Sequence, residues 1–267
     1  MPQRVFERFA EVADFVLGRE AVGSIVEVGA RDCAETLDFH RVYSGARILA
    51  FECNPATLPA CRQAVAGLER VKLIEKAVSD RPGSVSFFPT DPERTRTQEA
   101  GGNPGASSLF RATGEYPLET YVQNEITVEA TTLARVMHDE SVGTIDLLWM
   151  DIQGAELLAL KGLDARLDDV SLIHLEVEFF PIYEGQPLFG DLHRFLRGRG
   201  FTLLGFTSYS RFAADAVYAK RRVLRGPLAR WKLAWRCPYL LRNRLKQLKH
   251  RLKWAFLGHS SPPAWRS

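Results

Sequence analysis

Short apolar runs and segments with helical apolar spacing alternate along this 267-residue chain. Runs rich in β-branched residues predict buried strands, and apolar positions that recur every three or four residues predict helices. The strands are expected at residues 24–29, 47–52, 71–78, 84–88, 125–131, 144–150, 170–178, 201–207 and 214–219. The helices are expected at residues 4–20, 34–43, 54–67, 132–139, 154–161 and 188–198. This alternation predicts an α/β fold with a doubly wound, mostly parallel, seven-stranded sheet of the Rossmann-like kind, closed by a hairpin of the last two strands.

Polar and helix-breaking residues mark where these elements start and stop. Asn54 is predicted to cap the third helix, with Pro55 at the first helical position, and Gly200 is predicted to end the sixth. Residues 89–118 are rich in Pro, Gly, Asn, Ser and Thr. An irregular segment of that length is typical of a functional loop or of a disordered excursion. We favour a loop over the active site, and a surface excursion is the alternative.

Four carboxylates stand at or near the carboxyl ends of predicted strands: Glu27, Glu52, Asp151 and Glu178. In an open α/β sheet, such strand ends converge on one crevice that holds the ligand. Glu27 precedes Gly29, and a glycine in this turn lets the backbone approach a ligand closely. Glu52 follows Gly29 by 23 residues, a spacing typical of an acidic residue that binds two ribose hydroxyls. Each carboxylate taken singly has the alternative of an N-cap or a solvated loop residue.

The turn after the first strand also limits the kind of ligand. A dinucleotide-binding fingerprint needs three glycines, and residues 27–33 contain only Gly29. A pyrophosphate cradle is therefore not expected. A ligand with a ribose, an amine and no phosphates fits better, and S-adenosylmethionine is a ligand of that kind.

The segment from Ile145 to Glu156, followed by Leu160-Lys161-Gly162, resembles the signature of FkbM-type S-adenosylmethionine-dependent methyltransferases. Further stretches resemble motifs of this family in the same order: Glu27-Val28-Gly29-Ala30, Phe51-Glu52-Cys53-Asn54-Pro55, Ala77-Val78-Ser79-Asp80, Gly105-Ala106-Ser107-Ser108-Leu109 and Thr131-Thr132-Leu133. The resemblance covers residues 24–220.

This resemblance implies methyl transfer from S-adenosylmethionine, often to a hydroxyl of a sugar, glycan or natural product. It implies that the methionine end of the cofactor is bound by Glu27, Gly29, Ala30 and Arg31. It also implies that Glu52 binds the ribose hydroxyls and that Cys53 belongs to the same cofactor site. Ala77 and Val78 are expected to flank the adenine, and Ser79 or Asp80 to contact its amine. Asp151 is assigned both to the cofactor site and to catalysis.

An alcohol is a poor nucleophile until its proton is taken, so a general base or a metal is useful. Asp151 is the first candidate for this base, because it ends the central strand. Glu178 is the second, since His174, Glu176 and Glu178 point to one face by the strand period of two. His193 is a weaker candidate, because a lone histidine on a helix is usually a surface or satisfied core residue. No metal ligand is assigned, and a divalent metal such as Mg²⁺ is an alternative that we do not favour.

Three positions depart from the usual pattern of the family. The family usually has Asn-x-Gly after its first glycine, where this chain has Arg31-Asp32-Cys33. It usually has Lys and Glu where Trp149 and Gln153 stand. The first departure affects the methionine end of the cofactor, and the other two alter the surroundings of Asp151. Two alternatives therefore stay open: a non-catalytic cofactor-binding or scaffold protein on the same fold, and an N-methyltransferase.

Composition bears on size and compartment. A hydrophobic content of 46% supports a sizeable core. The four cysteines show neither metal-ligand spacing nor a dense disulfide pattern, which favours a reducing compartment. The first ten residues lack the apolar core of a signal peptide, and no run of 18 apolar residues predicts a membrane span. We therefore expect a cytoplasmic protein, and the sequence does not fix its oligomeric state.

Charge divides the chain into two parts. No Asp or Glu follows Asp215, and 14 of the 35 Lys and Arg lie at residues 220–267. Residues 1–219 consequently hold 21 basic against 32 acidic side chains. We predict a methyltransferase domain at residues 1–221, whose N-terminal helix lies within residues 1–20, and a basic amphipathic segment at residues 222–267.

The basic segment is predicted to form two helices, because Pro227 and Pro238 interrupt it. Leucines recur at helical spacing among its Arg and Lys residues, at positions 241, 245, 248 and 252, and tryptophans stand at positions 231, 235 and 254. This pattern is typical of an element at an anionic membrane surface, so we expect residues 222–257 to associate with the inner face of a membrane. The alternatives are packing on the acidic body or on a partner subunit. Nucleic acid is not favoured as a partner, because no recognised binding motif supports it.

Overall fold

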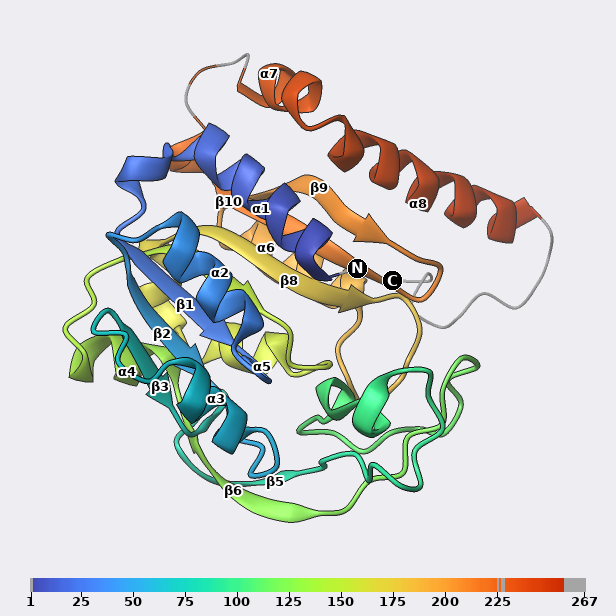
Figure 1. Cartoon of the computed structure of the whole chain (residues 1–267). Helices are drawn as coiled ribbons and strands as arrows, with labels where there is room; N and C mark the ends of the chain where they lie inside the picture. The colour runs from blue at the N-terminus through green and yellow to red at the C-terminus, as the bar shows by residue number, and fades with distance from the viewer. Residues whose placement is uncertain (1, 225, 227–228, 257–267) are drawn as a thin grey trace.

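A computed structural model describes residues 2–224, 226 and 229–256 of the chain. Within this part, seven strands form one sheet in the order β3-β2-β1-β7-β8-β10-β9, with helices on both faces (Figure 1). The bounds are β1 Ser24–Val28, β2 Arg47–Phe51, β3 Val71–Ile74, β7 Ile145–Met150, β8 Val170–Glu178, β9 Phe201–Tyr209 and β10 Ala213–Lys220. Strand β1 lies near the centre, because it pairs in parallel with β2 on one side and with β7 on the other.

The sheet is mixed. Strands β3, β2, β1, β7 and β8 are parallel, whereas β10 is antiparallel to both β8 and β9. The predicted α/β fold with a mostly parallel central sheet is confirmed, and the predicted hairpin of the last two strands is what makes the sheet mixed. Because β10 inserts between β8 and β9, the last strand within the described residues does not lie at the edge of the sheet.

Helices cover both faces of this sheet. Their bounds are α1 Pro2–Val16, α2 Ala34–Val42, α3 Leu58–Ala64, α4 Leu133–Asp139, α5 Glu156–Lys161, α6 Phe189–Gly198, α7 Ala229–Arg236 and α8 Pro238–Phe256. On one face, Phe9 of α1 packs against Trp149 of β7. On the other face, Leu160 of α5 and Leu192 of α6 belong to a second apolar cluster. The central strands are thus buried on both sides, which explains why they are continuous apolar runs in the sequence.

A smaller sheet was not predicted. It consists of β4 Ala77–Val78, β5 Gly83–Phe87 and β6 Ile126–Thr131, in the order β4-β6-β5. The single strand predicted at residues 71–78 is wrong, because the chain breaks after Ile74 and β4 pairs with β6 instead of β2. At the break, Lys76 N donates to the carbonyl of Ile74 at 2.9 Å. The strand-like pattern of residues 71–78 does not show that its first half pairs with β2 and its last two residues pair with β6.

The third helix starts later than predicted. Helix α3 begins at Leu58 with Thr57 at the N-cap. Asn54 is therefore not the N-cap, and its Oδ1 instead accepts a hydrogen bond from Ala56 N at 3.1 Å in a turn before the helix. This turn leaves the Asn54 amide nitrogen free to contact a distant loop.

Two helices follow β10, as the prolines predict, and α8 lies along β9 (Figure 1). Near the carboxyl end of β9, the hydroxyl of Tyr209 lies 2.9 Å from His250 Nδ1 of α8. The side chains of Leu252 and Trp254, which belong to the predicted amphipathic pattern, lie outside the described part of the structure. Residue 257, the end of the predicted membrane-associated segment, also lies outside it. Among the described helices, none combines the length and the apolar character needed to cross a bilayer. The division of the chain at residues 221 and 222 stays a prediction.

Candidate active site

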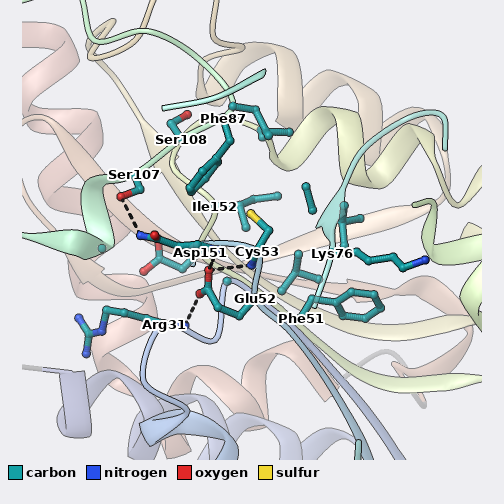
Figure 2. Close-up of a pocket in the computed structure, with 18 of the residues that line it drawn as sticks. Arg31, Phe51, Glu52, Cys53, Lys76, Phe87, Ser107, Ser108, Asp151 and Ile152 are labelled. Atoms are coloured by element: carbon teal, nitrogen blue, oxygen red, sulfur yellow. Dashed lines mark hydrogen bonds between the residues drawn. The ribbon is translucent and has the colours of Figure 1, made fainter. Parts of the chain in front are cut away.

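A pocket opens at the carboxyl ends of β1, β2 and β7, where the sequence predicts a ligand crevice (Figure 2). Glu52 and Asp151, which follow β2 and β7, both line it. The predicted site residues found in its wall are Gly29, Arg31, Glu52, Cys53, Ala77, Val78 and Asp151. The other predicted residues lie outside that wall, namely Glu27, Ala30, Ser79, Asp80, Glu178 and His193.

The turn after β1 depends on Gly29. Its φ of 89° lies in the region that favours glycine. A Cβ at this position would lie 2.0 Å from the backbone oxygen of Asp151. Asp151 N in turn donates to the carbonyl of Val28 at 3.0 Å, and the neighbouring Ala30 N donates to the carbonyl of Phe51 at 2.9 Å. Gly29 therefore permits three strand ends to meet beside the pocket.

The carboxylate of Glu52 organises two turns. Its Oε2 accepts a hydrogen bond from Arg31 N at 2.7 Å, and its Oε1 accepts from Cys53 N at 2.8 Å and Asn54 N at 2.6 Å. Burial raises the pKa of Glu52, while these N–H groups act in the opposite direction. A carboxylate offers about four acceptor positions. At most about one position is therefore left for a hydroxyl in the pocket, and the predicted contact of Glu52 with two ribose hydroxyls stays a prediction.

The pocket wall beside Glu52 is apolar. It is lined by Phe51, Ala77, Val78, Phe87 and Leu109. A wall of this kind suits an aromatic base. Ser79, which was predicted at the adenine amine, is instead buried behind the wall, where its N–H donates to the carbonyl of Thr131 at 2.9 Å.

Part of the irregular loop predicted at residues 89–118 reaches the pocket. Pro104, Gly105, Ser107, Ser108 and Leu109 all line it. Ser107 Oγ accepts a hydrogen bond from Asn54 Nδ2 at 3.4 Å (Figure 2), and Ser108 Oγ donates to the carbonyl of Gln153 at 2.7 Å. These contacts attach the loop to the turns that follow β2 and β7.

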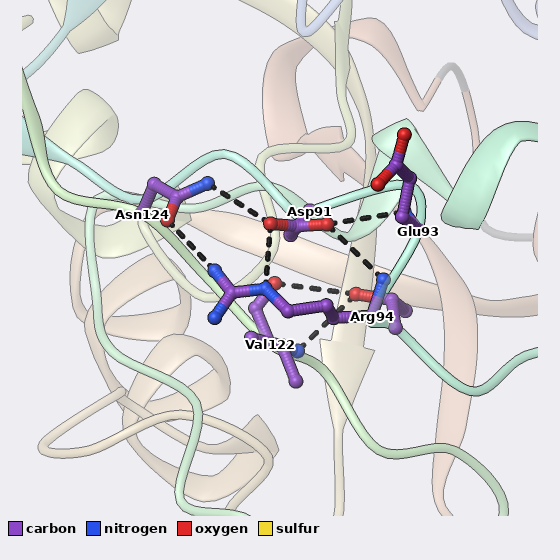
Figure 3. A network of polar contacts seen from close by, with 6 residues as sticks. Asp91, Glu93, Arg94, Val122 and Asn124 are labelled. Carbon is purple, nitrogen blue, oxygen red and sulfur yellow. Dashed lines mark hydrogen bonds and ion pairs between the residues drawn. The ribbon is translucent and has the colours of Figure 1, made fainter.

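A network around Asp91 fastens the base of the same loop (Figure 3). Asp91 Oδ1 accepts hydrogen bonds from the backbone N–H groups of Glu93 at 3.0 Å and Arg94 at 3.1 Å. The guanidinium of Arg94 donates from Nε to Asp91 Oδ2 at 2.8 Å and from Nη2 to Asn124 Oδ1 at 3.0 Å. The hydrogen bond from Arg94 lowers the pKa of Asp91. The start of the loop is thus tied to the segment before β6.

Gln153 joins two carboxylates beside the pocket. Its Nε2 donates to Asp151 Oδ1 at 2.8 Å and to Glu176 Oε2 at 2.6 Å, while its Oε1 accepts from the Tyr183 hydroxyl at 2.8 Å. Desolvation raises the pKa of Asp151, and the hydrogen bond from Gln153 acts against it. Asp151 is exposed where it lines the pocket. The sequence identified Gln153 only as a departure from a family pattern, because its two partners lie on different strands.

Glu27 lies behind the pocket wall. It is fully buried, Thr36 Oγ1 donates to its Oε2, and its Oε1 has no hydrogen-bond partner among the described residues. Desolvation raises the pKa of Glu27 well above its ordinary value. Glu27 pairs in register with Trp149 of β7. The predicted contact of Glu27 with the cofactor stays a prediction.

Glu178, the second predicted base, is 1% exposed, and neither carboxylate oxygen has a hydrogen-bond partner among the described residues. Burial raises the pKa of Glu178 well above its ordinary value. His193 lies on α6, with its Nδ1 3.1 Å from the Tyr218 hydroxyl, and does not line the pocket. Asp151 is therefore the one of these three candidates that reaches the pocket. Among the described residues, no group of three or more His, Cys, Asp and Glu side chains is placed to hold a metal ion.

A protein-family model described as the methyltransferase FkbM domain matches residues 27–203, which include every residue of the pocket wall. The chain is similar to the 2-O-methyltransferase NoeI of Sinorhizobium fredii, with 28% identity over 162 residues, 61% of this chain and 66% of that protein. It is also similar to the methyltransferase sdnD of Sordaria araneosa, with 28% identity over 155 residues, 52% of this chain and 60% of that protein. The match thus spans less than two thirds of either relative. A solved structure described as the METTL16 MTase domain is similar with a TM-score of 0.46 and 10% identity, over 79% of this chain and 66% of that one.

Proposed function

Because this chain belongs to the FkbM methyltransferase family, we propose that it transfers a methyl group from S-adenosylmethionine to a hydroxyl group of a sugar, glycan or natural product. The observation that carries the proposal is the convergence of Gly29, Glu52 and Asp151 on one pocket. The 2-O-methyltransferase activity named for one relative supports an oxygen acceptor.

The pocket suits this cofactor chemically. Glu52 has acceptor capacity left for a ribose hydroxyl, and the apolar wall that includes Phe51 and Phe87 suits adenine. The carboxylates of Glu35 and Asp151 also line the pocket and suit an amine or a sulfonium cation. Arg31 lines it as well, and its side chain is 41% exposed and within 3.5 Å of Asp32. When bound, the cofactor supplies an electrophilic methyl group on a sulfonium sulfur.

Asp151 is the residue that takes the proton of the acceptor hydroxyl in this proposal. It is exposed to the pocket, and Gln153 holds its carboxylate in place. Desolvation raises the pKa of Asp151, which brings its proton affinity closer to the pH at which a general base works best. The loop residues 104, 105 and 107–109 line the pocket, so they help to orient the acceptor and to exclude water.

Titration calorimetry with S-adenosylmethionine and S-adenosylhomocysteine tests the cofactor half of the proposal. The wild-type chain should bind both ligands. Glu52→Ala should weaken both by about 10-fold to 100-fold, because a charged acceptor of the ribose hydroxyls is lost. The exposed Glu69→Ala serves as the matched control and should bind as the wild type does.

Glu52→Ala also removes the acceptor of three backbone N–H groups, so its melting curve must be recorded alongside. Unchanged affinity in a folded Glu52→Ala chain would show that the ribose is bound elsewhere. Absence of binding by folded wild-type chain would overturn the enzyme reading. Binding of both ligands would justify a screen of sugar and glycan hydroxyl acceptors with labelled methyl groups.

A further inference from the structure

Helix α8 turns a partly polar face toward the body of the protein. Its buried residues include Leu240, Asn243 and Gln247. Asn243 Nδ2 donates to the carbonyl of Phe206 at 2.9 Å, and a Cβ on Gly205 would lie 2.7 Å from the Cβ of Leu240. This face is therefore the one that fixes α8 against β9.

The apolar stripe of α8 points away from that contact. Leu241, Leu245 and Leu248 are 49%, 56% and 43% exposed. Their spacing of four and three residues places them on one side of the helix. Leu241, Leu245 and Leu248 of the leucine pattern thus leave about half of their surface exposed to solvent.

The stripe continues onto α7. Trp231 of α7 and Leu241 of α8 line one shallow groove, together with Leu204 and Arg244. Trp231 is 69% exposed, and Trp235, one helical turn further on, is 84% exposed. Two tryptophans and three leucines therefore form one outward apolar strip, here called the α7–α8 face.

A row of basic residues borders this strip. Each of the three leucines is followed directly by a basic residue, namely Arg242, Lys246 or Lys249, and these three basic residues are exposed. None of them forms an ion pair with a described residue, and the chain has no Asp or Glu after Asp215. The long apolar stems of Lys and Arg let their charged ends reach a polar layer while the neighbouring leucines enter an apolar one.

We propose that the α7–α8 face docks on the surface of an anionic lipid bilayer. Such a surface accounts for both components of the face, because it takes the leucines and tryptophans into its interfacial layer and attracts the basic row. A second copy of the chain fits less well, since two such faces would bring basic rows together without any acidic partner. A nucleic acid would neutralise the basic row but would leave the leucines unexplained.

The direction of α8 relates this surface to the active site. Strand β9 runs in the same direction as β8, because both are antiparallel to β10. Helix α8 follows β9 from Leu240 near Gly205 to His250 near Tyr209. Its carboxyl end therefore lies on the same side of the sheet as the carboxyl ends of the parallel strands, where the pocket opens.

Co-sedimentation of the full chain with vesicles tests the proposal. We expect binding to phosphatidylcholine vesicles that contain about 30% phosphatidylglycerol, and much weaker binding to phosphatidylcholine alone. The variant R242Q/K246Q/K249Q should bind about 100-fold more weakly, because each basic residue near an anionic surface contributes about fivefold. The variant L241S/L245S/L248S should also bind at least about tenfold more weakly, because its apolar insertion is lost.

The matched control is R70Q/R81Q/R135Q, which removes the same charge from exposed residues away from α8 and should bind as the wild type does. Calorimetry with S-adenosylhomocysteine, or melting curves, will show that each variant is folded.

No binding of folded wild-type chain to anionic vesicles would overturn the proposal. Unchanged vesicle binding by the leucine variant, or tighter binding of the wild type to duplex DNA or RNA than to vesicles, would overturn it in favour of a soluble polyanion. If the wild type does not bind vesicles but forms a dimer that the leucine substitutions dissociate, the face would be assigned to contact with a second copy of the chain.

Discussion

The indole of Trp149 stacks on the imidazole of His174, with 3.7 Å between the ring centroids and 9° between the ring planes. Burial lowers the pKa of His174 to about 3, so the ring is neutral at physiological pH. Phe9 packs against both rings, with centroid distances of 5.4 Å and 5.1 Å. An aromatic stack thus stands at the position where the family pattern usually has Lys, and Trp149 of this stack lines the pocket.

Replacement of Trp149 by Ala should lower the free energy of unfolding by about 3–5 kcal/mol, because it leaves a cavity among aromatic rings. Trp149→Phe should cost less, since it keeps a ring against His174. Urea denaturation measures both. The exposed Trp231→Ala is the control and should change stability by no more than about 0.5 kcal/mol. Equal losses from the Ala and Phe variants would contradict the stacking role.

Gly29→Ala should be far more damaging than Gly18→Ala. The two glycines have φ values of 89° and 88°, so a side chain is strained at either position. Only Gly29 would also place its Cβ 2.0 Å from a backbone oxygen, whereas Gly18 has open space around it. We expect Gly18→Ala to cost about 1–3 kcal/mol and Gly29→Ala to cost more and to abolish cofactor binding. Melting curves and calorimetry measure this, and similar losses at both positions would mean that strand ends β1 and β7 can separate freely.

Gln153→Leu should shift the acidic limb of kcat/KM to higher pH, by about one unit, with any acceptor that supports turnover. Asp151 must be deprotonated to act as a base, and it loses the hydrogen bond that lowers its pKa. The exposed Gln63→Leu on α3 is the control and should leave the profile unchanged. A profile that Gln153→Leu does not move would argue against Asp151 as the base. Parallel measurement of cofactor affinity separates this effect from weakened binding.

Glu156→Gln should stabilise the protein at alkaline pH. The carboxyl group of Glu156 is fully buried, and desolvation raises its pKa from 4.5 to about 7. The folded state therefore binds this proton more tightly than the unfolded chain, and the resulting stability is complete below pH 4.5 and is lost as the pH rises through about 7. The Gln variant keeps an oxygen for Ile152 N, which donates to Glu156 Oε1 at 3.0 Å.

Melting temperatures of the wild type and of Glu156→Gln, recorded from about pH 4 to pH 8, test this linkage. The variant should melt higher near pH 8, and the difference should narrow toward pH 4.5. The exposed Glu184→Gln is the control for loss of a carboxylate. A constant difference across the whole range would show that Glu156 does not take up a proton on folding.

Asp91→Ala should loosen the loop without unfolding the domain. The change removes the acceptor of hydrogen bonds from Glu93 N, Arg94 N and the Arg94 guanidinium. We expect faster amide exchange at residues 91–124 and about tenfold weaker cofactor binding, because loop residues 104–109 form part of the pocket wall. Glu93→Ala, which removes an exposed carboxylate nearby, is the control. Exchange rates that do not change would assign the order of the loop to Ser107 and Ser108 instead.

The sequence predicts strands and the strand-end carboxylates well, because the period of apolar residues and the position of Glu52 and Asp151 are local properties. It does not show that the chain changes sheet after Ile74, since pairing partners are chosen by tertiary structure. It also does not show that Gln153 joins Asp151 to Glu176, which lies on another strand.

The orientation of helix α8 is likewise decided by tertiary structure. The leucines of its periodic pattern suggest a buried face, but Asn243 and Gln247 occupy that position. The polar side chain of Asn243 is accepted there because a carbonyl of β9 receives its hydrogen bond. Which side of a helix is buried thus depends on the surface it meets, and the helix sequence alone does not contain that surface.

The place of β10 in the sheet has a consequence for synthesis of the chain on the ribosome. Strand β10 is the last strand along the chain, yet it lies between β8 and β9 and pairs with both. A nascent chain that ends before Ala213 can assemble the strands from β3 to β8 but has no partner for the exposed side of β8. The nascent protein therefore carries an open sheet edge until residues 213–220 leave the exit tunnel, and an unpaired edge of this kind favours aggregation.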